Sequence, residues 1–429
     1  MAFLRVQNVD SLQADNVHIQ AVHLEESTCY KFLLRMHYKG GAYESYCVIQ
    51  SDSLGAIDLA RDSPIRGTYH TADPMGLFKT VQPTPEVRYG HWYGNPNADT
   101  VFYTLLLLTS SGSILDTVDI RRRWKHPSLQ EIKISCDDIH GVIFKPPGDG
   151  PFPCIIDIQG AIPAVSCGNA AVLASEGYMV ATFAYLELPN LPKFVNDLDL
   201  SIFSKHINYI LSLPYCSGKL GIMGFSYGGI VGNYIAVKHP EIAAVLTINA
   251  PEAFFLHTNG ELKDSGVVLK CEPLNGDLAT LINGCTLQTE CYEDLMRRLT
   301  PEVSIQWHRI PKETAFRVVG SMDDWLTANI TACRNVSRHL QETGHYVETD
   351  LVPAGHGLSF PYLPHQLITH NKWVSRKLGL GGEPVLHGKA QEDVWTRNLQ
   401  FFRKFLGDPV KLPDWEKDTA VSIPEKSKL

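Results

Sequence analysis

Residues 220–229 read Leu-Gly-Ile-Met-Gly-Phe-Ser-Tyr-Gly-Gly, and this stretch decides the fold of the longer part of the chain. Its apolar start predicts a buried strand, and apolar residues at helical spacing follow over 230–235. Between them stands Gly-x-Ser-x-Gly, whose glycines leave room for a turn that lifts the Ser226 hydroxyl clear of the sheet. The pattern predicts a nucleophilic serine. The alternative is a tight strand-to-helix turn with a solvated serine.

Composition narrows the classes of protein that the chain can belong to. With 429 residues, 44% of them apolar, the chain can form two or three globular domains. A net charge of −8 with both signs interspersed argues against a nucleic-acid partner. We find no N-terminal signal peptide and no apolar run long enough for a membrane span. The ten scattered cysteines predict reduced thiols of an intracellular protein, and we expect no metal and no other cofactor.

The final three residues, Ser427-Lys428-Leu429, match a peroxisomal address that an import receptor reads. They end a segment rich in Lys, Glu and Pro, residues 411–429, which predicts a flexible tail. The sequence therefore predicts a peroxisomal protein whose partners include the import receptor.

Residues 1–130 lack helical periodicity and predict an all-β sandwich domain. Short β-rich runs at 30–38 and 43–50 flank a turn, and 101–108 and 114–120 predict a hairpin. The run Arg-Arg-Arg-Trp-Lys-His at 121–126 closes this region. We expect it to be a charged edge or a solvated linker, and the alternative is a site for anionic phosphates at the domain junction.

Strands alternate with helices over residues 131–410, which predicts a mostly parallel sheet with helices on both faces. The first pair of strands, 132–136 and 141–145, forms a hairpin. Further strands are expected at 154–158, 178–184, 220–223, 243–248, 316–319 and 346–352, and helices at 170–176, 200–211 and 390–406.

A nucleophilic serine needs a base and an acid that orients the base, and in such a sheet they follow later strands in the order acid, then histidine. The strand 316–319 is followed by Asp323 and Asp324, and we prefer Asp323, three residues past the last glycine, while Asp324 stays open. His356, after the strand 346–352, is the predicted base. His345 precedes that strand and therefore belongs to the opposite edge of the sheet.

The oxyanion that forms during acyl transfer needs two backbone N–H donors. One is predicted at Tyr227, the residue after the nucleophile, and the other at Gly160 or Ala161, in the loop after strand 154–158. Pro163 has no N–H and cannot serve.

Seven short segments together resemble one known family. They are residues 72–77, 146–153, 191–193, 208–211, 319–320, 382–384 and 390–391. Through them the chain is similar to the type I acyl-CoA thioesterases and the bile acid-CoA:amino acid N-acyltransferases over nearly its full length. The resemblance implies an N-terminal immunoglobulin-like sandwich, a C-terminal α/β-hydrolase domain, acyl-CoA substrates, and catalytic residues at Ser226, Asp323 and His356.

Within this family, the serine nucleophile predicts hydrolysis of acyl-CoA to a free fatty acid. The amino-acid transferases of the family use a cysteine nucleophile, whereas an acyl group on Ser226 would be an oxyester, which is less prone to attack by amines. Transfer to glycine or taurine is the first alternative, and an esterase or peptidase with the same triad is the second. A lipid carrier without enzymatic activity is the third.

Overall fold

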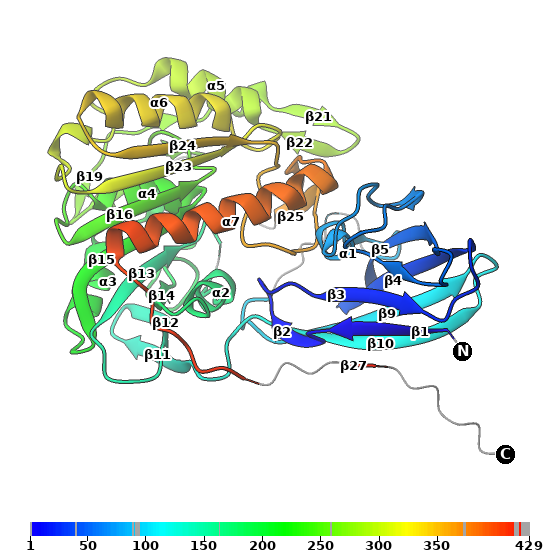
Figure 1. Ribbon diagram of the computed structural model, residues 1–429. Helices are drawn as coiled ribbons and strands as arrows, with labels where there is room; N and C mark the ends of the chain where they lie inside the picture. The colour runs from blue at the N-terminus through cyan, green and yellow to red at the C-terminus, as the bar shows by residue number, and fades with distance from the viewer. Residues whose placement is uncertain are drawn as a thin grey trace.

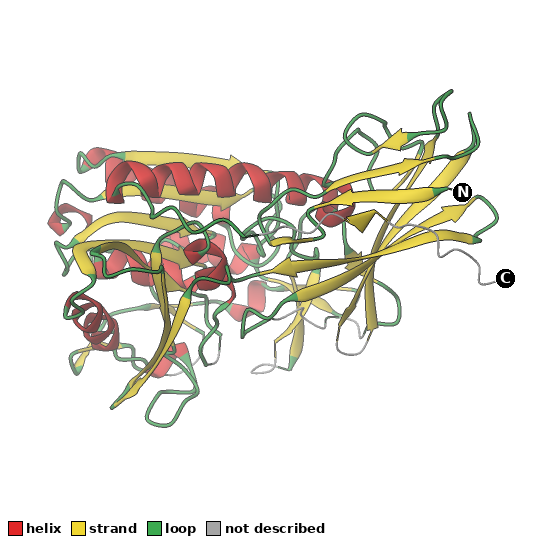
Figure 2. Ribbon diagram, turned by 60° about the horizontal axis from the view of Figure 1, so that its bottom comes forward, coloured by secondary structure: helices red, strands yellow, loops and turns green. Residues whose placement is uncertain are grey.

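The computed structural model describes residues 2–38, 41–87, 90, 95–162, 164–257, 260–371, 375–415 and 420–421. A β-rich part holds the N-terminus, and a larger part with helices packed on a sheet follows it (Figures 1 and 2). The change between them falls after β10 (Ile114–Arg123) and before β11 (Gln130–Cys136).

The N-terminal part is a sandwich of two sheets, as the sequence predicts. Alternate residues of its strands point inward, for example Leu4 and Val6 from one sheet and Leu105 and Leu107 from the other, and they share one core. The first sheet has the order β27 (Ala420–Val421), β1 (Phe3–Gln7), β3 (His18–Val22), β6 (Ile57–Asp58). The second has the order β2 (Asp10–Leu12), β10, β9 (Val101–Thr109), β4 (Cys29–Tyr38), β5 (Gly41–Gln50), β7 (Arg66–Gly67), with β8 (Gln82–Pro83) also on β5.

The predicted tail at 411–429 is only partly described. Residues 416–419 and 422–429, including Ser427-Lys428-Leu429, lie outside the described residues. The strand β27 pairs antiparallel with β1, so this segment of the tail lies along the edge of the sandwich.

The basic run at 121–126 is not simply a charged edge, and the prediction is wrong for Arg122. Its side chain is buried, and its guanidinium donates to the hydroxyl of Ser11 and to the backbone oxygens of Gln13 and Asp15. Because carbonyl oxygens satisfy several of its donors, the charge can be buried. Burial still lowers the pKa of Arg122 to about 10.

The C-terminal part has the strand order of the α/β-hydrolase fold. Its eight strands, counted along the chain, lie in the order 1-2-4-3-5-6-7-8, and all neighbours are parallel from the third position in the sheet onward. The predicted fold class is therefore confirmed. The strands are β11, β12 (Ile139–Lys145), β14 (Met179–Phe183), β13 (Phe152–Ile158), β15 (Cys216–Phe225), β16 (Ile242–Ile248), β23 (Ala315–Ser321) and β24 (Val347–Val352).

Both faces of this sheet are covered by helices. Neighbouring residues of β13 face opposite ways, so Ile155 joins one core cluster and Ile156 the other. The first face carries α2 (Gly168–Ala174) and α7 (Pro384–Leu406), and its cluster continues into the sandwich. The second face carries α3 (Ser201–Leu211), α4 (Tyr227–Ile235) and α6 (Asn329–Glu342).

Residues 249–314 form an excursion between β16 and β23 with short elements of its own. It contains β17 (Phe255–Leu256), β18 (Lys263–Asp264), β19 (Val267–Val268), β20 (Glu272–Pro273), β21 (Thr280–Ile282), β22 (Cys285–Leu287) and α5 (Thr289–Arg298). It also contains two turns of 3-10 helix, Gly276–Leu278 and Trp307–Arg309. A third turn of 3-10 helix, Val195–Asp197, lies outside this segment and precedes α3. The strands β25 (Ile368–Asn371) and β26 (Arg376–Gly379) join β22 and β21 in one small sheet. Among the described residues, no helix is both long and apolar enough to span a bilayer.

The two parts meet where α7 begins. Its first turns pack against α1 (Gly76–Lys79) of the sandwich, and a Cβ added to Gly388 would lie 2.7 Å from the Cβ of Lys79 (Figure 1). The buried Lys79 ammonium pairs with Asp73 at 2.8 Å within the sandwich and with Glu392 of α7. The ammonium is thus shared by one carboxylate from the sandwich and one from α7, and it links the two parts beside the loop that carries His356.

Candidate active site

Ser226 stands on the sharp turn between β15 and α4, as predicted. Its backbone has φ 52° and ψ −121°, a conformation that side-chain-bearing residues rarely adopt. Its N–H donates to the oxygen of Ile248 at 2.8 Å, which holds the turn against the neighbouring strand.

The glycines beside Ser226 are required by close backbone contacts. A Cβ on Gly228 would lie 2.0 Å from the oxygen of Ile158, and one on Gly224 would lie 2.6 Å from the oxygen of Gly228. Neither position has room for a side chain, so the two glycines of the motif are explained by packing alone.

The structure brings three predicted side chains together in one hydrogen-bonded row. Nε2 of His356 lies 3.1 Å from Oγ of Ser226, and Nδ1 lies 2.7 Å from Oδ2 of Asp324. The side chains of His356 and Asp324 are 6% and 1% exposed, so the hydrogen bond between them is shielded from water. The serine, the histidine and the aspartate lie after β15, β24 and β23, at one edge of the sheet.

The preferred acid, Asp323, is wrong, and Asp324 holds its place. Pairing with the β24 segment continues beyond Ser321, because the N–H of Asp323 still donates to Ala354 at 3.0 Å. Pairing therefore reaches Asp323, four residues past the predicted strand end at Val319. The next side chain, that of Asp324, is the one that meets His356. Asp323 points away from His356 and accepts from the indole of Trp325 at 2.8 Å and the N–H of Gly382 at 3.0 Å.

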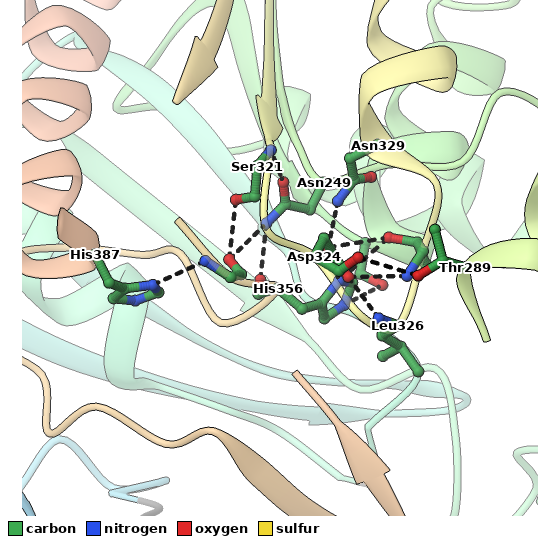
Figure 3. Close-up of polar contacts among 11 residues, drawn as sticks. Asn249, Thr289, Ser321, Asp324, Leu326, Asn329, His356 and His387 are labelled. Atoms are coloured by element: carbon green, nitrogen blue, oxygen red, sulfur yellow. Dashed lines mark hydrogen bonds and ion pairs between the residues drawn. The ribbon is translucent and has the colours of Figure 1, made fainter. Parts of the chain in front are cut away.

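Several further donors surround the Asp324 carboxylate (Figure 3). Oδ1 accepts from the N–H groups of Leu326 at 2.7 Å and Thr327 at 2.8 Å, and Oδ2 accepts from the Thr327 hydroxyl and the Asn329 amide. These contacts fix the carboxylate toward His356. An aspartate whose carboxylate accepts from the N–H groups two and three residues later forms an Asx-type turn, which the residue type alone permits at Asp324 as well as at Asp323.

The backbone around His356 is held by buried polar groups that the sequence did not reveal. The Asn249 amide donates to the oxygen of His356 at 2.8 Å, and the Ser321 hydroxyl donates to that of Gly355 at 2.9 Å (Figure 3). Nδ1 of His387, on α7, accepts from the N–H of Gly355 at 3.1 Å. Burial lowers the pKa of His387 to about 3, so its imidazole stays neutral and can accept that bond.

The loop after β13 lies against Ser226, where the second oxyanion donor is predicted. A Cβ on Gly160 would lie 3.3 Å from the Cβ of Ser226. Among the described backbone groups, we find no acceptor for the N–H of Gly160, Ala161 or Tyr227. Pro163 lies outside the described residues.

A buried tyrosine orients this loop. The hydroxyl of Tyr185 donates to the carbonyl oxygens of both Gln159 and Gly160. Burial raises the pKa of Tyr185, so the phenol stays protonated and remains a donor. In a trans peptide the N–H points opposite to the carbonyl, so the N–H groups of Gly160 and Ala161 point away from Tyr185.

Replacing Tyr185 by phenylalanine is expected to lower kcat about tenfold with little change in KM, since the freed loop would present its N–H donors less often. Tyr178→Phe is the matched control, because it removes a buried hydroxyl that donates to Gly407 at the far end of β14. Steady-state kinetics and thermal melting of both variants separate positioning from stability. Equal loss of kcat in the two variants would contradict the role of Tyr185.

His345 lies apart from this site, as the sequence predicts. It is buried, and its ring contacts the Thr343 hydroxyl and the backbone oxygen of Ile310. Among the described residues, no group of His, Cys, Asp and Glu has the arrangement of a metal site.

Comparison with known proteins identifies the family. Residues 198–408 match the family model described as BAAT / Acyl-CoA thioester hydrolase C terminal, and residues 14–136 match the acyl-CoA thioester hydrolase/BAAT N-terminal region. The chain belongs to this family. The resemblance seen in the sequence is therefore confirmed.

Relatives of both reaction types are similar to the chain over most of its length. Acyl-coenzyme A thioesterase 5 of Mus musculus is 28% identical over 398 residues, which cover 87% of this chain and 90% of the relative. Acyl-coenzyme A thioesterase 1 of Homo sapiens is 29% identical over 394 residues, 86% of this chain and 88% of the relative. The bile acid-CoA:amino acid N-acyltransferase of Mus musculus is 26% identical over 431 residues, which cover 96% of this chain and 99% of the relative.

Proposed function

We propose that this protein is a serine hydrolase that cleaves acyl-CoA to a free fatty acid and CoA. The observation that carries the proposal is the row Ser226, His356, Asp324, with contacts of 3.1 and 2.7 Å. A serine that shares a hydrogen bond with a histidine, itself held by a buried carboxylate, has the arrangement needed for nucleophilic catalysis.

In the first half-reaction, Oγ of Ser226 attacks the thioester carbonyl while Nε2 of His356 takes its proton. Asp324 keeps Nδ1 of His356 protonated and stabilises the imidazolium. The N–H of Tyr227, with that of Gly160 or Ala161, donates to the oxyanion. The carbon–sulfur bond then breaks, the His356 imidazolium gives its proton to the departing CoA thiolate, and the acyl group stays on Ser226 as an ester.

In the second half-reaction, neutral His356 takes a proton from a water molecule, which attacks the ester carbonyl. The tetrahedral intermediate collapses, the fatty acid leaves, and His356 returns the proton to Oγ of Ser226. Apart from the substrate and this water molecule, the two half-reactions use only groups of the chain.

The identity of the nucleophile favours water over an amine as the acceptor. The intermediate on Ser226 is an oxyester, which is less reactive toward amines than the thioester that a cysteine would form. This chemistry supports hydrolysis above transfer to an amino acid, although the family includes both activities.

The test is product analysis with an acyl-CoA in the presence of glycine or taurine. We expect free fatty acid as the main product with either amine, since water attacks the oxyester. A panel of acyl-CoAs, with thiol release as the readout, would then define the acyl chain. An N-acyl amide as the main product would contradict the thioesterase proposal.

The same panel, extended with carboxylic esters and peptides, separates the remaining alternatives. An esterase or peptidase would cleave esters or peptides faster than acyl-CoA. A carrier would bind acyl-CoA without thiol release. Peroxisomal location and a part in fatty acid metabolism stay proposals that rest on Ser427-Lys428-Leu429 and on the proposed substrate.

A further inference from the structure

A cleft of about 510 Å³ opens between the sandwich and the catalytic sheet. Segments from both parts line it: residues 97–100 and β10 from the sandwich, and β11, β12 and the loop after β13 from the catalytic part. Its charged and polar lining includes Asn97, Thr100, Arg123, Lys125, Glu131 and Lys133.

The cleft lining gathers three cations, Arg123, Lys125 and Lys133, beside two carboxylates, Asp99 and Glu131. The carboxylate of Asp10 neutralises Arg123. The cations left to meet an anionic ligand are therefore Lys125 and Lys133.

The cations stand in ion pairs that hold them at the cleft wall. Arg123 is paired with Asp10, and Lys125 lies 2.6 Å from a carboxylate oxygen of Glu131. Lys133 lies 4.0 Å from the other oxygen of Glu131 and is 81% exposed. Glu131 therefore sits between two ammonium groups that a phosphate could bind in its place.

The sheet register gives the distance from the cleft to Ser226. Val142, in the cleft wall, pairs with Thr182, Thr182 with Asp157, and Asp157 with Met223. Three strand spacings make about 14 Å, and the three residues from Met223 to Ser226 add about 10 Å along the strand. Val142 therefore lies about 17 Å from Ser226, and Lys133, which pairs with Val142 on the next strand, lies one strand spacing further out.

The loop that leaves the oxyanion site reaches the same cleft. Gly160 lies against Ser226, and Val165, five residues later, lines the cleft. Five residues span at most about 18 Å, which agrees with the distance from the register.

The pantetheine arm of CoA matches this span. About fourteen bonds separate the thioester carbon, which Ser226 attacks, from the first phosphorus of the pyrophosphate, which corresponds to nearly five extended residues, or roughly 16 Å. With the thioester at Ser226, the pyrophosphate and the 3′-phosphate of the adenosine would reach the cleft.

The geometry points to the cleft as the binding site for the phosphorylated nucleotide of CoA, with Lys125 and Lys133 as its phosphate-binding residues. This inference rests on the proposed acyl-CoA substrate. For the basic run at 121–126, the sequence left open a site for anionic phosphates at the domain junction. The inference takes up that alternative for Lys125 but not for the buried Arg122.

The test compares an acyl-CoA with the acyl-pantetheine of the same chain, which lacks the phosphates. In Lys125→Gln/Lys133→Gln, KM for acyl-CoA should rise about tenfold at low salt, since charge-assisted hydrogen bonds are lost. KM for acyl-pantetheine should not change. Lys219→Gln is the matched control, because Lys219 is exposed on β15 near its start, at the opposite edge of the sheet.

A second variant should change the affinity for CoA in the opposite direction. Glu131→Gln removes the carboxylate that competes for the two lysines, so CoA should bind about threefold more tightly in calorimetry. Equal effects on both substrates, or unchanged CoA binding in both Lys125→Gln/Lys133→Gln and Glu131→Gln, would overturn the assignment. If wild-type protein binds CoA through the cleft but cleaves neither substrate, the proposed function fails and the site stands.

Discussion

Replacing Ser226 by alanine is expected to lower kcat for acyl-CoA hydrolysis by at least about four orders of magnitude, because no other hydroxyl can form the acyl-enzyme. The strained backbone at φ 52° stays the same, so the fold and its melting temperature should not change. Thiol release at saturating acyl-CoA measures the loss.

Two controls make this result specific. Ser212→Ala removes a hydroxyl that only caps the end of α3, donating to Tyr209, and should keep full activity. Calorimetry should show that Ser226→Ala still binds acyl-CoA. Turnover within about tenfold of wild type would mean that another nucleophile carries the reaction.

Replacing Asp324 by asparagine is expected to lower kcat by about 10⁴. The amide NH₂ would donate to Nδ1 of His356, so the imidazole would carry its proton on Nε2, the tautomer that cannot accept the proton of Ser226. The side chain keeps its shape, and its oxygen can still accept from Leu326 and Thr327. The loss should therefore appear in kcat and not in folding.

Asp323 provides the matched control for Asp324. Asp323→Asn should keep activity within about threefold and cost about 1 kcal/mol of stability, because the hydrogen bonds of its carboxylate go to Trp325 and Gly382 and not to His356. The variant with the larger loss of kcat identifies which of the two neighbouring carboxylates orients His356. A severe loss of kcat in Asp323→Asn with near-normal activity in Asp324→Asn would contradict the geometry.

The sequence was sufficient for the parts of the site that local pattern controls. Ser226 follows from a motif whose glycines have direct steric reasons, and His356 follows from its position after the last strand of the sheet. The α/β-hydrolase fold class follows from alternating apolar runs and the resemblance. These features depend on few residues, close together in the chain.

Features that depend on the exact end of a strand or on distant contacts could not be predicted. Asp324 holds the place of Asp323 because backbone pairing continues past Ser321 to Asp323, a matter of register that propensity does not specify. Arg122 is buried because oxygens from residues 11–15 meet it across the sheet. Tyr185 and His387 act through contacts with loops far away in the chain, which no local pattern reveals.

The most direct test of the central claim is rapid-quench mass spectrometry of the wild-type enzyme with an acyl-CoA in ¹⁸O-water. We predict a peptide containing Ser226 that carries the acyl group, followed by free fatty acid with one ¹⁸O atom in its carboxyl group. An acyl group on another residue, or acyl-Ser226 that yields no labelled acid, would contradict hydrolysis through this serine.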